Sequence, residues 1–219
     1  MTDNTQARTE VLRRIRAAIG TTPTADAAAI DAEWNAMRRA YRRASELDRE
    51  ALLHQLEDRL RDYDAGVYRA GPEGLRELIG TILAERGKRK MAIPEGVPGE
   101  WLPAGVAFVA DMRDDLFELD HCDGVLTSAT LAIAETGTIV LQDAAGQGRR
   151  AATLLPDYHL CVVAADSVVQ SVAEAMARLQ ATAALATTFF SGPSATADIE
   201  MTRIKGVHGP RFVDVIFVV

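Results

Sequence analysis

Polar side chains and glycines gather in three short motifs in the second half of the sequence. These are residues 132–141 (AIAETGTIVL), 191–200 (SGPSATADIE) and 206–210 (GVHGP). Each adjoins a run of strand-forming residues, and in α/β domains such breaks fall where strands end. Ligands bind in these domains outside the carboxyl ends of the strands. We therefore predict a single pocket lined by hydroxyls, backbone N–H groups, one histidine and carboxylates.

The second motif has the residue types of an anion site. A strand ends at a turn imposed by Gly192 and Pro193, and hydroxyl residues precede a short helix-like run, whose free backbone N–H groups would favour an anion. Asp198 and Glu200 would repel a phosphate there unless a cation or a hydroxylated ligand intervenes. Helix capping by a hydroxyl such as that of Ser194 is the alternative. The candidate ligand-binding residues are Ser191, Gly192, Pro193, Ser194, Thr196, Asp198 and Glu200.

Glu135 is the candidate general base or nucleophile. It stands at a sharp break between two apolar segments, where a carboxylate needs a partner, an open pocket or a raised pKa. Such a carboxylate suits proton abstraction or covalent catalysis. A turn glutamate that points to water is the other interpretation, with Gly137 supplying a positive φ. Thr136 and Gly137 are added as candidate ligand contacts.

His208 is the second candidate catalytic residue. Gly206 and Gly209 flank it, which predicts a loop rather than a core position. There it would donate to a ligand or transfer a proton, or pin the loop by a structural hydrogen bond. Gly206 and Gly209 are included among the candidate ligand-binding residues. Arg203 and Lys205 lie close enough in sequence to balance the acids of the second motif.

Two further patterns are set aside. Residues 146–151 (GQGRRA) match a dinucleotide fingerprint with Asp166 downstream, but the short span to the next strand and Pro156 leave no room for a crossover helix. Arg149 and Arg150 remain candidate anion contacts or salt-bridge partners. Residues 121–123 (HCD) are adjacent on an extended segment, so their side chains point to opposite faces and a structural role is expected.

The pattern around these motifs predicts an α/β fold with a mainly parallel, mixed sheet and helices on both faces. Apolar faces at helical spacing predict helices over 75–83 and 168–179. Residues 138–141 are expected to form a hairpin with the preceding strand. The predicted strands lie at 91–93, 106–110, 124–134, 138–141, 160–164, 187–190 and 213–219.

The sequence divides into an N-terminal helical segment, 1–65, and an α/β domain, 66–219. Apolar stripes repeat in the first segment at helical spacing, and its arginine pairs are interpreted as the solvated face of a helix. These helices are expected to pack on the main domain or on another subunit. The stripes are residues 11, 12, 15 and 19, then Trp34, Met37 and Tyr41, then Leu52, Leu56 and Leu60.

Composition excludes several classes of protein. The two cysteines, Cys122 and Cys161, match no metal or redox spacing, so the chain by itself is not expected to hold an iron–sulfur cluster or a structural zinc of the usual kind. A metal that joins Asp198 and Glu200 stays an open alternative. No signal-peptide core or membrane span is recognised, which predicts a cytoplasmic protein. The net charge of −7 argues against binding to nucleic acid.

The three motifs, in this order before a terminal strand, resemble the LUD-domain lactate utilization proteins of the LutC/YkgG type over residues 66–219. The resemblance implies a fold similar to the NagB/RpiA/CoA-transferase-like group. It also implies a role in oxidising L-lactate to pyruvate, with two iron–sulfur partner subunits that hold the redox cofactors. Ala195 departs from the pattern, since many relatives have a basic residue there. By analogy with the fold, Glu135 is the expected base or nucleophile.

Two functions compete at this point. The first is a subunit of a lactate-oxidising complex, which binds a small organic acid or anion and contacts partners, or a second copy, through its N-terminal helices. The second is an independent enzyme for a phosphosugar or an acyl-CoA, with Glu135 as base or nucleophile. The second requires a strong anion site, yet the 191–200 motif has two acids and no Lys or Arg. We favour the first. A scaffold with a vestigial pocket is the third reading.

Overall fold

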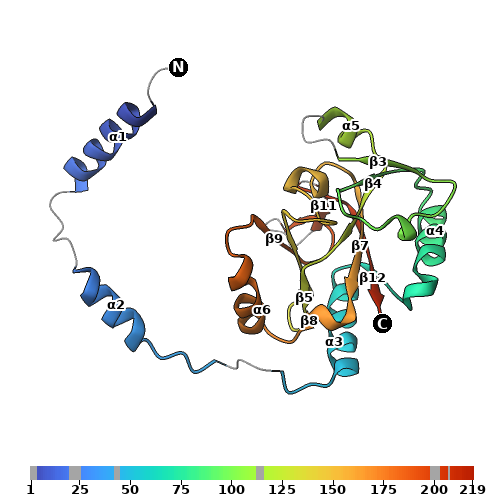
Figure 1. The fold of residues 1–219 in the computed structure, drawn as a ribbon, viewed down its shortest axis with the longest axis horizontal. Coiled ribbons are helices and arrows are strands. Elements are labelled where there is room, and N and C mark those ends of the chain that lie inside the picture. Colours follow the sequence, from blue (N-terminus) through green and yellow to red (C-terminus); the bar gives the residue numbers. More distant parts are fainter. Residues whose placement is uncertain (1–3, 20–25, 42–44, 112–115, 198–202, 207) are drawn as a thin grey trace. The chain divides into compact units, whose positions relative to one another are not determined.

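A computed structural model of the chain describes residues 4–19, 26–41, 45–111, 116–197, 203–206 and 208–219. The chain divides into two compact units, Met1–Tyr41 and Arg42–Val219. The first contains helices α1 (Asn4–Ile19) and α2 (Ala27–Ala36). The second contains the described β-sheets (Figure 1).

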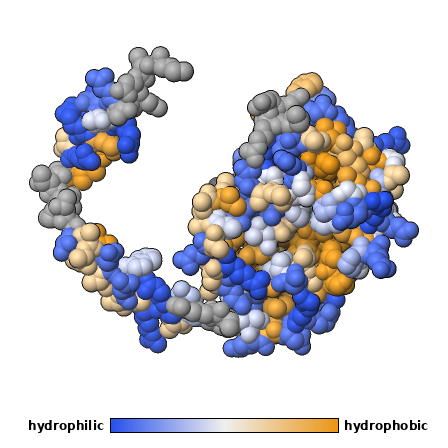
Figure 2. Space-filling view, viewed as in Figure 1, coloured by the Kyte–Doolittle hydropathy of each residue, from blue (hydrophilic) through white to orange (hydrophobic). Residues whose placement is uncertain are grey.

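The first unit exposes apolar side chains among many charged ones (Figure 2). Helix α2 ends at Ala36, so Trp34, Met37 and Tyr41 do not form the predicted helical stripe. Met37 is already extended, and beyond it the guanidinium of Arg39 donates to the carbonyl oxygens of Trp34 and Met37 at 2.8 and 3.3 Å. The exposed members of the α1 stripe are Val11, Ile15 and Ile19.

Six parallel strands form the main sheet of the second unit, in the order β1-β12-β7-β4-β2-β3. Short apolar runs between polar turns give strands of this kind, buried on both faces. The strands are β1 (Gly66–Ala70), β2 (Lys90–Ile93), β3 (Ala107–Ala110), β4 (Gly124–Ser128), β7 (Tyr158–Ala164) and β12 (Phe212–Val218).

Helices cover both faces of this sheet, which confirms the predicted α/β class. Helix α4 (Leu75–Glu85) buries its apolar stripe against Tyr158, Leu160 and Ile216 on one face. The alternate residues of β7 and β12 face the other way, where Val163 and Phe217 pack with α3 (Arg49–Asp62). Helix α5 (Leu116–Asp120) packs on the same side, against β2 and β4.

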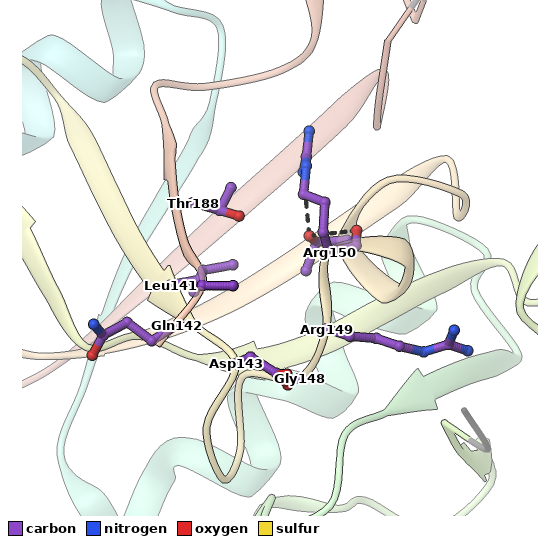
Figure 3. Close-up of a pocket in the computed structure, with 9 residues that line it drawn as sticks. Leu141, Gln142, Asp143, Gly148, Arg149, Arg150 and Thr188 are labelled. Carbon is purple, nitrogen blue, oxygen red and sulfur yellow. Dashed lines mark hydrogen bonds between the residues drawn. The ribbon is translucent and has the colours of Figure 1, made fainter. Parts of the chain in front are cut away.

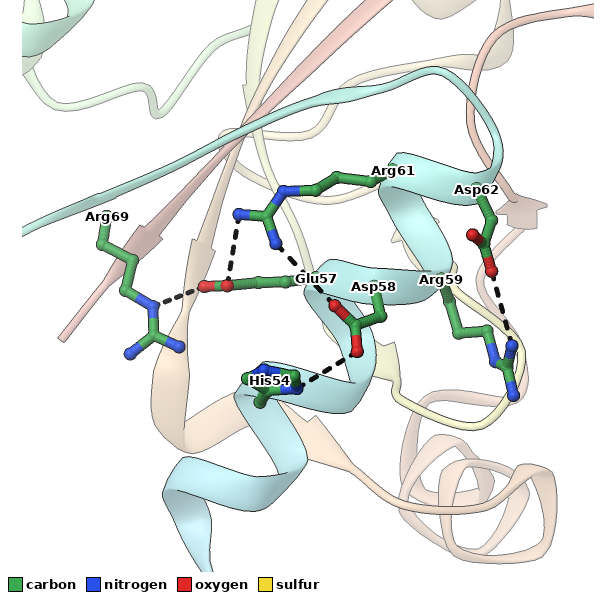
Figure 4. Close-up of polar contacts among 7 residues, drawn as sticks. All are labelled: His54, Glu57, Asp58, Arg59, Arg61, Asp62 and Arg69. Carbon is green, nitrogen blue, oxygen red and sulfur yellow. Dashed lines mark hydrogen bonds and ion pairs between the residues drawn. The ribbon is translucent and has the colours of Figure 1, made fainter.

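Helix α3 is built into the second unit. Leu56 and Leu60 have no exposed surface and join the core beside the sheet. Glu57, only 6% exposed, accepts a hydrogen bond from Arg69 of β1 and another from Arg61 at 3.3 Å (Figure 4). The predicted domain boundary at residue 65 would separate α3 from this core, whereas the compact unit begins at Arg42.

A second sheet, in the order β8-β5-β6-β9, lies between the main sheet and helix α6 (Figure 1). Strands β5 and β6 form the predicted antiparallel hairpin. The hairpin is therefore not part of the main sheet, which is entirely parallel. Its residues alternate between two cores, with Ile139 facing the main sheet and Val140 facing α6. The elements are β5 (Leu131–Ile133), β6 (Thr138–Gln142), β8 (Val168–Val169), β9 (Thr187–Phe190) and α6 (Val172–Leu179).

Helix α6 starts later than predicted. Ser171 caps it by accepting from the backbone N–H of Glu174, and the Glu174 carboxylate accepts from the backbone N–H of Ser171. This capping box begins the helix at Val172, so Val168 lies in a strand. The Ser-x-x-Glu signal was present in the sequence.

A buried carboxylate holds the centre of the main sheet. Asp214 of β12 has no exposed surface and receives two hydrogen bonds from Arg86, at 2.8 and 2.6 Å. The Tyr158 hydroxyl of β7 donates to it at 2.8 Å. Gly66 faces it across the sheet, where a Cβ would lie 2.1 Å from Asp214 Oδ1. The C-terminal end of α4 and the strands β1, β7 and β12 thus meet at the Asp214 carboxylate.

Replacing Arg86 with methionine keeps the aliphatic stem but leaves the Asp214 carboxylate without its cation. Removing one partner of a buried ion pair costs about 3 kcal/mol or more in the free energy of unfolding. Because the Arg86 side chain is 36% exposed, we expect a loss near the lower limit, about 3 kcal/mol, in urea denaturation.

Arg59→Met is the matched control, since the Arg59–Asp62 pair is exposed on both sides. Its change should stay below about 1 kcal/mol. If both variants lose the same stability, the Asp214 network does not hold the sheet.

Candidate functional site

Backbone hydrogen bonds join the second and third predicted motifs in space. The backbone N–H of Ser194 donates to the Pro210 carbonyl at 2.8 Å, and that of Gly206 donates to the Ser194 carbonyl at 3.0 Å. The backbone N–H of His208 donates to Ser194 Oγ at 3.2 Å. Ser194 is thus the point at which the loop after β9 is joined to the loop before β12.

The residues after Ser194 form a strand rather than the predicted helix start. Strand β10 (Ala195–Ala197) pairs antiparallel with β11 (Arg203–Lys205). Thr196 is opposite Ile204, and two β-branched residues favour the extended form. Residues 195–197 therefore do not form the helix N-terminus that would supply an anion site. Asp198 and Glu200 lie outside the described residues, as do the side chains of Thr196, Arg203 and Lys205.

The two joined loops enclose a cavity of about 210 Å³, which we call the loop pocket. Among the predicted site residues, those that line it are Ser191, Gly192, Pro193, Ser194, His208 and Gly209. It lies at the amino ends of two main-sheet strands, since His159 and Val213 are the second residues of β7 and β12. It also lies at the carboxyl end of β9, whose last residue, Phe190, lines it, so the expected position holds for β9 but not for the two main-sheet strands.

Gly206 lies beside the pocket and does not line it. Its backbone has φ +85°, and a Cβ would be 2.3 Å from Cγ of Arg211. Arg211 in turn forms a bidentate pair with Asp157 at 2.7 Å for both bonds. Gly206 therefore allows the loop to pass closely over this ion pair.

Glu135 lies in the β5–β6 turn and is not among the residues that line the loop pocket. Gly137 has a positive φ of +61°, as the turn interpretation expects. A Cβ on Gly137 would lie 2.8 Å from Cβ of Arg59 in α3. Hydroxyls link the turn to the pocket. Thr136 Oγ1 is 2.7 Å from Thr138 Oγ1, which is 2.8 Å from Ser191 Oγ. The catalytic roles of Glu135 and His208 stay predictions.

The structure separates the two adjacent arginines that were candidate anion contacts. Arg149 forms a bidentate pair with Asp111, whose side chain is 5% exposed, with bonds of 2.8 to 3.2 Å. The side chain of Arg150 points away from that of Arg149 (Figure 3) and donates to Thr153 Oγ1 at 3.3 Å. Arg150 and Thr153 line the loop pocket and a neighbouring pocket of about 160 Å³, the one drawn in Figure 3.

His159 is a pocket residue that sequence analysis missed. It lies in the apolar strand β7, 2% exposed, with Nε2 at 2.8 Å from Thr127 Oγ1 and its ring 5.1 Å from that of Phe190. Burial, together with a smaller effect of the positive charge of Arg150, lowers the pKa of His159 to about 3. The imidazole is neutral at physiological pH. In the sequence it is indistinguishable from a core position of a strand.

A wider pocket of about 610 Å³ lies at the carboxyl ends of β2 and β3. Gly148, from the 146–151 glycine motif, lines this pocket. That motif is followed by a single turn of 3₁₀ helix, Arg150–Thr153, and not by the crossover helix of a dinucleotide-binding fold. Three carboxylates in its lining, from Glu95, Asp111 and Asp143, face one arginine, Arg149. This balance does not favour an anion.

The two cysteines are buried, and His121 and Asp123 of the His-Cys-Asp run contact backbone groups, as expected for structural residues. Both cysteines are buried free thiols, and burial raises the pKa of Cys161 to about 12. His121 Nδ1 contacts the Phe117 carbonyl, whereas Asp123 accepts from the backbone of β2 at Lys90. Within the described ranges, no three His, Cys, Asp or Glu side chains could hold a metal ion together. No helix of the described chain has the length and apolar character of a membrane span.

Comparison with known proteins identifies relatives for most of the chain. The sequence model of the LUD domain matches residues 53–218. Lactate utilization protein C of Deinococcus radiodurans is 44% identical over 176 residues, 78% of this chain and 82% of that protein. Uncharacterized protein YkgG of Escherichia coli is 36% identical over 88 residues, 37% of this chain and 38% of that protein.

A solved structure supports the same relationship. The crystal structure of a DUF162 family protein from Deinococcus radiodurans superposes with a TM-score of 0.67 and 37% sequence identity. The match covers 79% of this chain and 99% of that one. At this identity the likeness extends beyond the fold to the sequence.

The neutral state of His159 predicts a pH dependence of stability. In the unfolded chain a histidine has a pKa near 6.5, against about 3 in the fold. Between about pH 6.5 and pH 3 the unfolded chain binds a proton at His159 that the folded chain does not. The neutral imidazole therefore contributes fully to the free energy of unfolding above about pH 6.5, and this contribution is lost as the pH falls.

The His159→Gln variant lacks this proton uptake. From pH 7 to pH 5, urea denaturation should show wild type losing about 2 kcal/mol more in the free energy of unfolding than the variant. Identical pH profiles for the two proteins would contradict a buried, neutral imidazole.

Proposed function

The chain belongs to the LUD domain family, and from this we propose that it is a component of an L-lactate utilization system that oxidises lactate to pyruvate with iron–sulfur partner subunits. The observation that carries the proposal is the relative named Lactate utilization protein C, 44% identical over 78% of this chain. Relatives with this name support a role in lactate utilization.

Partner subunits with redox cofactors follow from the chemistry of the reaction. Oxidising lactate to pyruvate removes two electrons and two protons, and the electrons need an acceptor. An iron–sulfur cluster is usually held by four cysteine thiolates, whereas these 219 residues include two cysteines, both buried free thiols. We therefore assign the electron acceptors to partners and the handling of the organic acid to this chain.

The loop pocket is the proposed site for that acid. Its volume of about 210 Å³ is below the range of roughly 300–1,000 Å³ typical of pockets for drug-sized ligands. A three-carbon acid suits this size better than an acyl-CoA or a phosphosugar does. Ser191, Ser194 and His208 supply hydroxyl and imidazole contacts. We keep Glu135 as a candidate proton acceptor; it precedes Thr136, whose hydroxyl is linked through Thr138 to Ser191 of the pocket.

Partners are proposed to dock on the N-terminal helices. Ile15 and Ile19 of α1 are 46% and 67% exposed, and Trp34 of α2 is 60% exposed. Exposed apolar side chains beside charged ones are typical of interaction surfaces.

The Ile15→Ser/Ile19→Ser double variant should retain less of the iron–sulfur partners in affinity capture, or form fewer oligomers in light scattering, because it removes apolar contact area. Its urea denaturation should match that of wild type, since these side chains are outside the core of the Arg42–Val219 unit. Unchanged capture together with an unchanged oligomeric state would rule out this docking surface.

Reconstitution tests the proposed function. We expect lactate-dependent dye reduction by the iron–sulfur partners to require the full chain, and to fall at least tenfold with Glu135→Gln or His208→Ala, because each removes a proton-handling group. Arg76→Met, at an exposed position of α4 on the other face of the main sheet, is the control that keeps activity.

Equal dye reduction by the partners alone would overturn the proposal. Full activity with Glu135→Gln and with His208→Ala, but none without the chain, would leave the subunit role standing and remove the two residues from catalysis.

A further inference from the structure

We propose that the loop pocket binds a short 2-hydroxycarboxylate, with Arg150 on the carboxylate and Nδ1 of His159 on the 2-hydroxyl. The choice of acid rests on the proposed function. The binding geometry rests on the charge, the hydrogen-bond donors and acceptors, and the size of the pocket.

Arg150 provides the anion contact. Other arginines of the second unit are ion-paired, among them Arg86 with Asp214, Arg149 with Asp111 and Arg211 with Asp157. Within the described residues, Arg150 pairs with no carboxylate, and its side chain donates to Thr153 Oγ1. Four of the five guanidinium N–H groups remain available, in a fork that matches a carboxylate.

The charge of the pocket suits a monoanion. Among the described residues that line the cavity, Arg150 is the one permanently charged side chain, and none is an aspartate or a glutamate. His159 is neutral at physiological pH because it is buried. A single positive charge offsets one carboxylate, whereas a phosphate or a dicarboxylate would keep an unbalanced negative charge.

The tautomer of His159 follows from a chain of hydrogen bonds behind it. The Cys161 thiol lies 3.8 Å from the Ser128 carbonyl oxygen, to which it donates. The Thr127 hydroxyl donates to Cys161 Sγ at 3.6 Å. Its one proton is then committed, so Nε2–H of His159 donates to Thr127 Oγ1 at 2.8 Å. This assignment leaves Nδ1 unprotonated, as an acceptor.

His159 lines the loop pocket. Within the described residues, its Nδ1 has no hydrogen bond to another protein group, whereas Nε2 is bonded to Thr127. Nδ1 is therefore the ring nitrogen that we assign to a ligand in the pocket. An unprotonated nitrogen in this position accepts a hydrogen bond from a hydroxyl group but cannot donate one to a carbonyl oxygen.

The remaining lining fits the small acid. Phe190 and Val213 provide apolar surface for a methyl group, and the hydroxyls of Ser191 and Ser194 are available to a second carboxylate oxygen. The pocket therefore distinguishes three parts of the ligand: the carboxylate, the 2-hydroxyl and a small apolar end.

Calorimetric titration of the full chain with three acids tests the assignment. L-Lactate should bind, and propionate, which lacks the hydroxyl, roughly tenfold more weakly, since one hydrogen bond is lost. Pyruvate should also bind more weakly than lactate because its carbonyl has no proton for Nδ1. Arg150→Gln should weaken lactate and propionate alike, on the order of 10- to 100-fold.

His159→Gln is the decisive variant. Its amide can still reach Thr127 but lacks the Nδ1 acceptor, so the ratio of lactate to propionate affinity should fall to about one while propionate affinity is kept. Arg211→Gln, which removes the same charge outside the pocket, should bind lactate as wild type does. Far-ultraviolet circular dichroism and thermal unfolding establish that each variant is folded.

Three results would overturn the site: no lactate binding at millimolar concentration, propionate or pyruvate binding as tightly as lactate, or wild-type affinity in Arg150→Gln. These outcomes differ from a failure of the proposed function. If lactate binds as expected but the iron–sulfur partners oxidise lactate without the chain, the site stands and the subunit role fails. If the partners need the chain but Arg150→Gln supports full oxidation, the role stands and this site fails.

Discussion

A carboxylate without exposed surface lies in the middle of the parallel sheet, and the placement of the other parts depends on how it is satisfied. Asp214 is held by Arg86 at the end of α4 and by the Tyr158 hydroxyl. Such a charge is costly to bury unless both its ion pair and its hydrogen bonds are complete. Gly66 is required opposite because a side chain there would occupy the space of the carboxylate.

This network stands directly behind the loop pocket. In a strand, successive side chains point to opposite faces, so Tyr158 and Asp214 face α4 while His159 and Val213 face the pocket. His159 and Val213 are also register partners across β7 and β12. The interaction that fixes the amino ends of these strands on one face therefore fixes the floor of the pocket on the other. Loops joined at Ser194 complete the wall.

The electrostatics of the pocket depend on how neighbouring groups are paired. Arg149 and Arg150 are adjacent in sequence, yet Asp111 neutralises the first and no described carboxylate reaches the second. Burial keeps the His159 imidazole uncharged, so among the described lining residues Arg150 is the one permanent cation, beside several hydroxyl and imidazole groups. A small site with this balance is selective through a few well-placed polar groups.

The sequence by itself determined the class of fold, the hairpin after residue 134, and the two loop motifs that meet at Ser194, because hydrophobic period and turn residues are local properties. It also carried the family relationship, through motifs whose combination is specific. Tertiary structure alone decided that the hairpin belongs to a second sheet, that residues 195–197 pair as a strand, and that α3 is part of the core. It separated Arg149 from Arg150 and brought His159 into the pocket, since pairing and burial depend on residues far apart in the chain. A histidine in an apolar strand gives no sign in sequence of whether it faces a core or a cavity.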